Sequence, residues 1–315
     1  MSRLTEDVPF HFAAERLDDR RGDAAWLAAA LADAGTRYVP VRAGLSSYIW
    51  EGETPRALLL DAATAKPLLP EAACCVLMGE WDGKPCFALG LAGEAPLPEA
   101  RHDDLRGVSG LLPAEELALL GYARAMVHWH GMHRHCGRCG APTASERAGH
   151  MRACGSCGAE YFPRIDPAII VLVTDGDRCL LGRQASWPKG RYSTIAGFVE
   201  HGETLEAAVL REVKEETDIE VRAPRYVSSQ PWPYPGSLML GFRAEAASTA
   251  IHCNDGELEH AAWFSRDDIA RSVDDSLMMP PSRSISYRLI KGWYEEEAGR
   301  SFTALKHVDP NKAGR

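Results

Sequence analysis

The residues best suited to chemistry lie in one segment, AGFVEHGETLEAAVLREVKEETDI, at positions 196–219, six of which are glutamates. At about 100° per residue, one helical stripe collects the following side chains: Leu205, Ala208, Val209, Glu212, Glu216 and Ile219. Glu215 lies at the edge of the stripe, whereas Glu206 and Lys214 point elsewhere. The stripe therefore begins as an apolar core face and continues as a row of carboxylates.

Carboxylates on the apolar face of a helix need a cation. A solvated acidic face would lie opposite the apolar residues, but these glutamates continue the apolar row, where an unpaired charge is costly to bury. Like charges four residues apart also repel each other. Divalent cations between the carboxylates remove both costs, and Mg2+ keeps coordination positions for water and substrate phosphates. The pattern indicates an enzyme that binds a pyrophosphate and activates water against it.

Four of the nine cysteines form two pairs, Cys136 with Cys139 and Cys154 with Cys157, separated by residues 140–153. Four thiolates at this spacing suit one tetrahedral Zn2+, and we expect the glycine inside each pair, at 137 and 155, to ease the turn. Because sulfur completes the site, the zinc is predicted to be structural, and neighbouring histidines are not expected to be ligands. A redox pair and an iron–sulfur centre are the alternatives, and a ribbon that binds nucleic acid is a further one.

Composition narrows the class of protein. The chain has 315 residues, 45% hydrophobic and 25% charged, which is typical of a folded protein of two or three domains. We expect a cytoplasmic protein without disulfides, since the sequence shows neither a membrane-length apolar run nor a secretory signal pattern. The net charge of −9 argues against generic binding of polyanions, although a local basic patch is compatible with it.

The patterning predicts an α+β fold with a mixed sheet instead of a doubly wound one. Helices are predicted at 24–35, closed by Gly35, at 113–133, after Thr204 as the cap, and within 284–299. Strands are predicted at 56–62, 86–93, 225–232, 237–246 and 260–266, with a hairpin at 168–184. We divide the chain into an N-terminal domain (1–130), a zinc ribbon (131–162) and a catalytic domain (163–315). The first 112 residues show no chemical motif.

The acidic segment resembles the signature of Nudix hydrolases, in which a glycine, a spaced glutamate and an Arg-Glu-x-x-Glu-Glu core recur. The matching residues are Gly197, Glu203, Arg211, Glu212, Glu215, Glu216 and Ile219. Asp218 stands where the family has a helix-ending glycine, and we expect local strain there without loss of activity. The resemblance implies a Nudix α/β/α sandwich with a mixed sheet, preceded by the zinc ribbon and an N-terminal α+β domain.

A second motif narrows the resemblance. Residues 229–237, SQPWPYPGS, are similar to the proline-aromatic motif of the NADH pyrophosphatase (NudC type) family, which also carries a four-cysteine ribbon. This resemblance implies that Glu212, Glu216 and the carbonyl of Ala196 hold Mg2+ or Mn2+, with Glu215 as a further ligand or base. It implies a pairing of Glu203 with Arg211. A further metal ligand is assigned to Glu257, with Glu259 as the alternative.

The same resemblance implies substrate contacts. Phe162 and Phe198 would stack on adenine, the alternative being that both pack in the core. The remaining predicted substrate residues are Gln230, Pro231, Trp232, Pro233, Tyr234, Pro235, Gly236, Ser237, Ser286 and Arg106.

The implied reaction is hydrolysis of NADH or NAD+ to nicotinamide mononucleotide and AMP, by a homodimer without a membrane partner. The same bond is cut when family members remove NAD caps from RNA, and the acidic net charge favours the small dinucleotide. One alternative is a Nudix enzyme for ADP-ribose or diadenosine polyphosphates, which the proline-aromatic motif disfavours. Another is a zinc-ribbon regulator that senses a nucleotide without cleaving it, which the intact glutamate core disfavours. No Rossmann or P-loop fingerprint is found.

Overall fold

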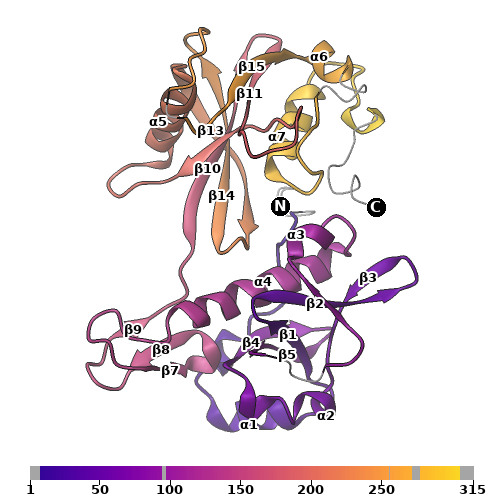
Figure 1. Ribbon diagram of the computed structural model, residues 1–315, viewed down its shortest axis with the longest axis vertical. Coiled ribbons are helices and arrows are strands. Elements are labelled where there is room, and N and C mark those ends of the chain that lie inside the picture. Colours follow the sequence, from indigo (N-terminus) through magenta and orange to yellow (C-terminus); the bar gives the residue numbers. More distant parts are fainter. Residues whose placement is uncertain (1–7, 94–96, 255, 272–276, 306–315) are drawn as a thin grey trace. The chain divides into compact units, whose positions relative to one another are not determined.

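A computed structural model of the protein describes residues 8–93, 97–254, 256–271 and 277–305. It divides into two compact units, each with its own core (Figure 1). The N-terminal unit comprises Phe10–Ile165 together with Trp232–Gly236, and the C-terminal unit contains Asp166–Pro231 and the chain from Ser237 onward. The predicted boundaries after residues 130 and 162 stay a prediction.

The N-terminal unit is built on a mixed sheet in the order β3-β2-β1-β5-β4, with β6 paired to β2. Its strands are β1 (Arg37–Arg42), β2 (Leu45–Glu51), β3 (Thr54–Ala57), β4 (Cys74–Trp81), β5 (Lys84–Leu91) and β6 (Arg101–Asp103). The central pair, β1 and β5, is parallel, and its neighbours pair antiparallel. The strand predicted at 86–93 is confirmed by β5.

Helices cover both faces of this sheet. They are α1 (Ala24–Ala32), α2 (Ala62–Ala65), α3 (Leu105–Val108) and α4 (Ala114–Met132). On one face, α4 buries the predicted apolar row that includes Leu117 and Ala123, and on the other face α1 and α2 pack over Tyr38 and Phe87. The long helix predicted at 113–133 is therefore confirmed.

Two predicted elements in this unit end differently. The strand predicted at 56–62 stops at Ala57, because the Asp61 side chain accepts a hydrogen bond from the Thr64 N–H and caps α2 instead. The helix predicted at 24–35 ends at Ala32, before Gly35, with Asp33 as its C-cap.

A three-stranded ribbon follows α4. It consists of β7 (Thr143–Glu146), β8 (Met151–Cys154) and β9 (Glu160–Tyr161) in the order β7-β8-β9. Two buried hydrogen bonds and one partly buried hydrogen bond join it to the rest of the N-terminal unit. His130 Nε2 donates to the Gly149 carbonyl at 2.8 Å, Arg152 Nη1 donates to His130 Nδ1 at 3.0 Å, and His150 Nε2 donates to the Leu77 carbonyl at 2.8 Å. The His130 imidazole must be neutral in this arrangement, since one ring nitrogen donates to a carbonyl while the other accepts from a guanidinium.

The C-terminal unit has a second mixed sheet in the order β13-β14-β10-β11-β15, with β12 paired to β10. Its strands are β10 (Asp166–Asp175), β11 (Arg178–Arg183), β12 (Ile195–Phe198), β13 (Val221–Trp232), β14 (Ser237–Ala246) and β15 (His260–Ser265). β10 pairs parallel with β14 and antiparallel with β11 and β12. The hairpin predicted at 168–184 and the three later strands are confirmed.

The faces of this sheet carry different helices (Figure 1): α5 (Leu205–Thr217) on one, and α6 (Arg266–Arg271) and α7 (Ile285–Tyr294) on the other. Alternating side chains of β10 serve the two cores: Ile169 and Val171 pack toward α5, and Leu172 packs toward α7. This three-layer arrangement confirms the predicted α+β fold with a mixed sheet.

The buried His130 and the half-buried His150 predict an acid-sensitive fold. Burial lowers the pKa of His130 and of His150 from 6.5 to about 4. Between these values the unfolded chain binds more protons than the folded one, so we expect stability to fall as pH drops from 6.5 toward 4, by up to about 1.4 kcal/mol per pH unit for each histidine. Urea unfolding at several pH values measures this slope.

His130→Gln removes one of the two titrations and should make the slope shallower. The exposed His128 on the same helix supplies the control, since His128→Gln should leave the slope unchanged. Equal slopes for His130→Gln and the wild type would contradict the assignment.

Candidate active site and zinc site

The helix that carries the glutamate box, α5, begins as its sequence predicts. The Thr204 hydroxyl accepts a hydrogen bond from the Ala207 N–H at 3.2 Å, so Thr204 is the cap. The predicted stripe is confirmed: Ala208, Val209, Glu212, Glu216 and Ile219 are buried. Glu206, Lys214 and Glu215 are exposed. Two carboxylates therefore lie on the core-facing side of the helix, with Glu216 only 4% exposed.

The Glu212 carboxylate lies directly over the backbone of Gly197 on β12. A Cβ atom at position 197 would overlap the carboxylate carbon and both of its oxygens. Only glycine leaves room for this approach, and the carboxylate thereby reaches the strand that contains the Ala196 carbonyl. The first glycine of the box is thus explained by the space that Glu212 requires.

A single guanidinium organises the acids of the box. Arg211 donates to Glu203 (Nη2 to Oε1, 2.6 Å), to Glu212 (Nη1 to Oε1, 2.8 Å) and to Glu215 (Nη1 to Oε2, 2.9 Å). It also donates to the Phe198 carbonyl at 2.9 Å, and so joins the loop to the helix. The Glu203–Arg211 pairing expected from the resemblance is present in the structure.

The charge on Glu212 is not fully compensated by protein groups. Burial raises the pKa of Glu212, the nearby carboxylates of Glu215 and Glu257 raise it further, and Arg211 opposes this effect. A site that disfavours a bare carboxylate and gathers further acids fits a divalent cation with oxygen ligands.

Glu257 and Glu259, the two candidates for the additional ligand, differ in their surroundings. Glu257 is close enough to Glu212 for its charge to act on that carboxyl group. Glu259 forms an ion pair with Arg183 instead. The assignment of the additional ligand to Glu257, with Glu259 as the alternative, stays a prediction.

Asp218 ends α5 in the left-handed conformation, with φ of 60°. This is the conformation for which the family uses glycine, as the sequence predicts. The Asp218 carboxylate lies 2.5 Å from Lys214 Nζ, and its N–H donates to the Lys214 carbonyl at 2.9 Å. The substitution therefore keeps the cap and adds an ion pair that offsets part of the backbone strain.

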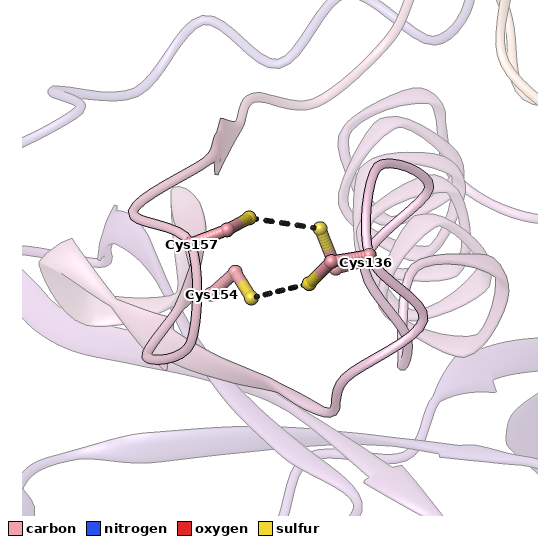
Figure 2. A group of neighbouring side chains, drawn as sticks. Cys136, Cys154 and Cys157 are labelled. Carbon is pink, nitrogen blue, oxygen red and sulfur yellow. Dashed lines mark hydrogen bonds between the residues drawn. The ribbon is translucent and has the colours of Figure 1, made fainter.

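Four sulfur atoms gather in the ribbon (Figure 2). The ligand atoms of Cys136, Cys139, Cys154 and Cys157 all lie within 4.8 Å of one another. Cys136 Sγ is 3.6 Å from Cys157 Sγ, and Cys139 Sγ is 3.5 Å from Cys154 Sγ. Zinc–sulfur bonds of about 2.3 Å in a tetrahedron place sulfur atoms about 3.8 Å apart, so the four thiols fit one Zn2+.

The two halves of this site share one backbone design. In each, the N–H of the residue after the second cysteine donates to the first cysteine's carbonyl, Gly140 to Cys136 and Gly158 to Cys154. Both glycines have positive φ, 76° and 71°. The expectation that Gly137 and Gly155 ease the turns was wrong, because the left-handed residue follows the second cysteine of each pair.

One contact near the zinc site was missed by sequence reasoning. The Tyr161 hydroxyl lies 3.1 Å from Cys136 Sγ, and this hydrogen bond leads the interactions that lower the pKa of the Cys136 thiol. A donor of this kind stabilises a thiolate. No spacing rule points to Tyr161, because its hydroxyl reaches the sulfur only after β9 has paired with β8.

The two phenylalanines predicted to stack on adenine are both exposed. Phe162, in the N-terminal unit, is 56% exposed, and Phe198, in the C-terminal unit, is 60% exposed. The alternative that they pack in a core is therefore wrong. Exposed aromatic rings are available for stacking.

The proline-aromatic loop belongs to the N-terminal unit, although it connects two strands of the other sheet. The ring of Tyr234 packs edge-on against Phe10 and Trp232, with centroids 5.8 and 5.1 Å away. The guanidinium of Arg106 lies 4.5 Å from the Tyr234 ring centroid, so two of the predicted substrate residues meet here. Arg124 of α4 donates to the Pro233 carbonyl, and Pro235 and Gly236 complete the loop.

Gln230 and Ser286 are already bonded within the C-terminal unit. The Gln230 side chain is fully buried, donates to the Arg283 carbonyl at 2.7 Å and accepts from the Ile285 N–H at 2.7 Å. Ser286 Oγ accepts hydrogen bonds from the backbone N–H of Thr194 and from its hydroxyl. Both side chains thus hold the start of α7 in place. Pro231 ends this segment of the unit, and Ser237, 9% exposed, begins β14.

Comparison with known proteins agrees with this geometry. Three family models match: a NUDIX domain at residues 164–285, an NADH pyrophosphatase-like rudimentary NUDIX domain at 45–129 and an NADH pyrophosphatase zinc ribbon domain at 132–162. The zinc ribbon match and the sulfur geometry support zinc over the redox and iron–sulfur alternatives. The N-terminal relation was not recognised from sequence, because that domain lacks a glutamate box.

Individual relatives carry related names. The chain is 39% identical over 234 residues to the NAD-capped RNA hydrolase NudC of Stutzerimonas stutzeri, covering 74% of this chain and 81% of the relative. It is 41% identical to the mitochondrial NAD(P)H pyrophosphatase NUDT13 of Homo sapiens (64% of this chain, 61% of the relative). It is 43% identical to the NAD-capped RNA hydrolase NudC of Mycobacterium bovis (60% and 64%). The chain thus spans less than two thirds of the length of these last two relatives.

The carboxylate-bearing α5, the open backbone at Gly197 and the matched domain define the chain as a Nudix hydrolase. With its rudimentary N-terminal Nudix domain and four-cysteine ribbon, it belongs to the NADH pyrophosphatase (NudC type) family. Among the described residues, none of the helices combines the length and apolarity needed to cross a bilayer.

Loss of one thiol should empty the zinc site. We expect one zinc ion per chain in the purified wild type and much less than one in Cys136→Ser, together with a lower unfolding temperature, because three ligands leave the tetrahedron open. Metal analysis by mass spectrometry measures the content. Cys253→Ser, which changes an exposed cysteine outside the ribbon, should keep one zinc. Full zinc occupancy in Cys136→Ser would refute the four-thiol site.

The contact between Gly197 and Glu212 predicts a defect in binding the catalytic metal. Gly197→Ala should push the Glu212 carboxylate away from β12 and weaken Mn2+ binding by about tenfold or more. Electron paramagnetic resonance titration with Mn2+ measures this affinity. Gly292→Ala in α7, where a Cβ meets open space, is the matched control and should bind Mn2+ normally. Unchanged affinity in Gly197→Ala would show that the ion does not depend on this carboxylate position.

Proposed function

We propose that this protein hydrolyses the pyrophosphate bond of NADH or NAD+, giving nicotinamide mononucleotide, reduced or oxidised, and AMP. The observation that carries the proposal is the pair of buried carboxylates on α5, Glu212 and Glu216, with Glu212 held against Gly197. This pair of carboxylates belongs to an intact Arg-Glu-x-x-Glu-Glu core, in a chain of the NADH pyrophosphatase family.

The catalytic cation is proposed to be Mg2+ or Mn2+. Glu212, Glu216, Glu257 and the carbonyl of Ala196 would hold it, since hard cations of this kind prefer oxygen ligands. When bound, the cation supplies charge neutralisation of the phosphates and a more acidic bound water.

The residues of the chain have distinct tasks in the proposed reaction. A water molecule attacks one phosphorus atom, the bridging P–O bond breaks, and one proton leaves the water. Glu215, exposed at the edge of the stripe, is placed to accept that proton or to serve as a further ligand. Arg211 holds Glu212 and Glu215 in position by a hydrogen bond to each carboxylate.

Substrate binding is proposed to use the exposed rings. Phe162 and Phe198 would stack on adenine, and the 230–237 segment with Arg106 would face the nicotinamide ribose or the phosphates. Gln230 and Ser286 would support this region indirectly, because their polar atoms already bond protein partners.

Removal of NAD caps from RNA is a second candidate activity, because two of the relatives bear the name NAD-capped RNA hydrolase. The bond broken is the same, with a polymer attached to the adenosine. The net charge of −9 favours the free dinucleotide. A homodimer is also proposed from the family resemblance, and light scattering would measure it.

Product analysis tests the proposal. Purified protein with Mg2+ or Mn2+ is incubated separately with NADH, NAD+, ADP-ribose and an NAD-capped RNA, and products are separated by chromatography. We expect NADH to yield reduced mononucleotide and AMP much faster than ADP-ribose is cleaved. Glu216→Gln should lower the rate by at least about a hundredfold, because it removes a buried carboxylate from the metal site.

Glu206→Gln is the matched control, since Glu206 lies on the exposed side of α5, and its rate should equal that of the wild type. Cleavage of capped RNA alone would support the proposed hydrolysis of the pyrophosphate bond and would make NAD-capped RNA the substrate in place of the free dinucleotide. Binding of a nucleotide without cleavage of any of the four would refute the enzyme and favour a sensor.

A further inference from the structure

A polar cavity of about 160 Å3 lies in the C-terminal unit, lined by residues from three strands and two helices. Arg225 of β13, Arg243 of β14 and Arg266 at the start of α6 contribute guanidinium groups to it. Trp293 and Glu296, from the end of α7 and just beyond it, also line the cavity. None of these residues belongs to the glutamate box or to the proline-aromatic loop.

The cavity is separate from the catalytic carboxylates. Thr174 of β10, which lines it, continues the row of side chains that faces α7, whereas α5 packs on the opposite face. Along the strand, Ala196 pairs with Ile170, four residues before Thr174. At about 3.3 Å per residue, Thr174 lies roughly 13 Å along β10 from Ile170, the residue that pairs with Ala196.

Two of the three arginines are held in fixed positions. Arg243 Nη2 donates to Glu296 Oε2 at 3.0 Å, and its Nη1 contacts the other carboxylate oxygen. Arg266 lies 4.1 Å from the Trp293 ring centroid and donates from Nη2 to the Trp293 carbonyl at 3.0 Å. The Arg266 Nε–H is buried and finds no hydrogen-bond acceptor among the described residues, and the ion-pair oxygen of Glu297 is 3.7 Å away.

The balance of charge in the cavity is positive. Arg225 makes no hydrogen bond or ion pair within the described ranges. The hydrogen bond from Arg243 lowers the pKa of Glu296 most, and the charges of Arg243, Arg266 and Arg225 lower it further. The other lining acid, Glu245, forms an ion pair with Arg222, at 3.3 Å. The lining thus holds three guanidinium groups and two carboxylates, and Glu297, which lies outside the lining, is shared between Arg266 and Arg300. The lining residues leave one positive charge in excess for an anion to offset.

We propose that this cavity binds a phosphate group. Arginine presents several N–H donors in a planar fork that matches phosphate oxygens, and an ordered guanidinium loses little freedom when it binds one. A volume of about 160 Å3 is below the range of pockets that enclose whole ligands, so only the phosphate of a larger molecule would enter. The source is either inorganic phosphate or the end of a phosphomonoester.

The competing explanation is that the arginines only fasten α7 to the sheet. It accounts for Arg243 and Glu296 but gives no task to Arg225, and it predicts that no phosphate binds. The two explanations also predict different effects of removing the Glu296 charge. If the cavity binds phosphate, Glu296 competes with it and its loss raises the affinity for phosphate. If the arginines only fasten α7, the loss of Glu296 only destabilises the fold.

Calorimetric titration with inorganic phosphate tests the proposal on the full-length protein with its zinc and without added divalent cations, so that no catalytic metal binds the phosphate. We expect saturable binding at one site per chain, weakened about tenfold in Arg225→Gln, which removes a donor that holds no structural contact. Glu296→Gln should bind phosphate more tightly, because the competing carboxylate is gone. Arg271→Gln, an exposed arginine of α6 outside the cavity, should behave as the wild type.

A second titration with AMP identifies the source. Displacement of phosphate by AMP, with the same loss in Arg225→Gln, assigns the site to phosphomonoesters, whereas phosphate binding without displacement assigns it to the free ion. Absence of phosphate binding in both the wild type and Glu296→Gln would overturn the proposal. Equal affinity in Arg225→Gln and the wild type would overturn it as well. The product analysis above is independent of these results.

Discussion

The catalytic unit depends on one electrostatic constraint: two carboxylates of α5 lie on the side of the helix that faces the core. Burial raises the pKa of Glu212 and so disfavours its charged form, which means that the surrounding structure must bring positive charge to this carboxylate. Arg211 does so from the helix itself, and a divalent cation completes the compensation. The same constraint explains the glycine at 197, where the Glu212 carboxylate occupies the space of a side chain. It also explains Glu203, which holds the Arg211 guanidinium in place. The box is therefore one electrostatic unit in which each member supports another.

Much of this unit could be predicted from sequence, because its information is local. The stripe of α5, the cap at Thr204 and the left-handed end at Asp218 follow from periodicity and from the preferences of single residues. The four-thiol cluster follows from the spacing of its cysteines. What spacing cannot supply is long-range pairing. Gln230 was predicted to contact substrate, but its amide is satisfied by the backbone at the start of α7, more than fifty residues later.

The same limit applies to the N-terminal unit. Its sheet has a parallel central pair flanked by antiparallel strands, as the catalytic sheet does, and its family match is to a rudimentary Nudix domain. No catalytic motif marks this relation. The buried acid of α4, Glu116, bonds Arg56 and the Ala57 N–H and so serves packing instead of a metal. Architecture can thus persist where the chemistry that reveals it in a sequence is absent.

The membership of Trp232–Gly236 in the N-terminal unit has a consequence for the order in which the chain is made. A ribosome releases residues 10–165 well before it has synthesised this loop. The ring contact of Phe10 with Tyr234 and the hydrogen bond from Arg124 to Pro233 can therefore form only later. The N-terminal unit is then complete only after β13 of the next unit has emerged. For the same reason, a fragment cut at the end of the ribbon would lack part of its own core, and the remaining fragment would expose Trp232 and Tyr234 to solvent. Folding of the two units is coupled through the covalent path of the chain, even though each has a separate sheet.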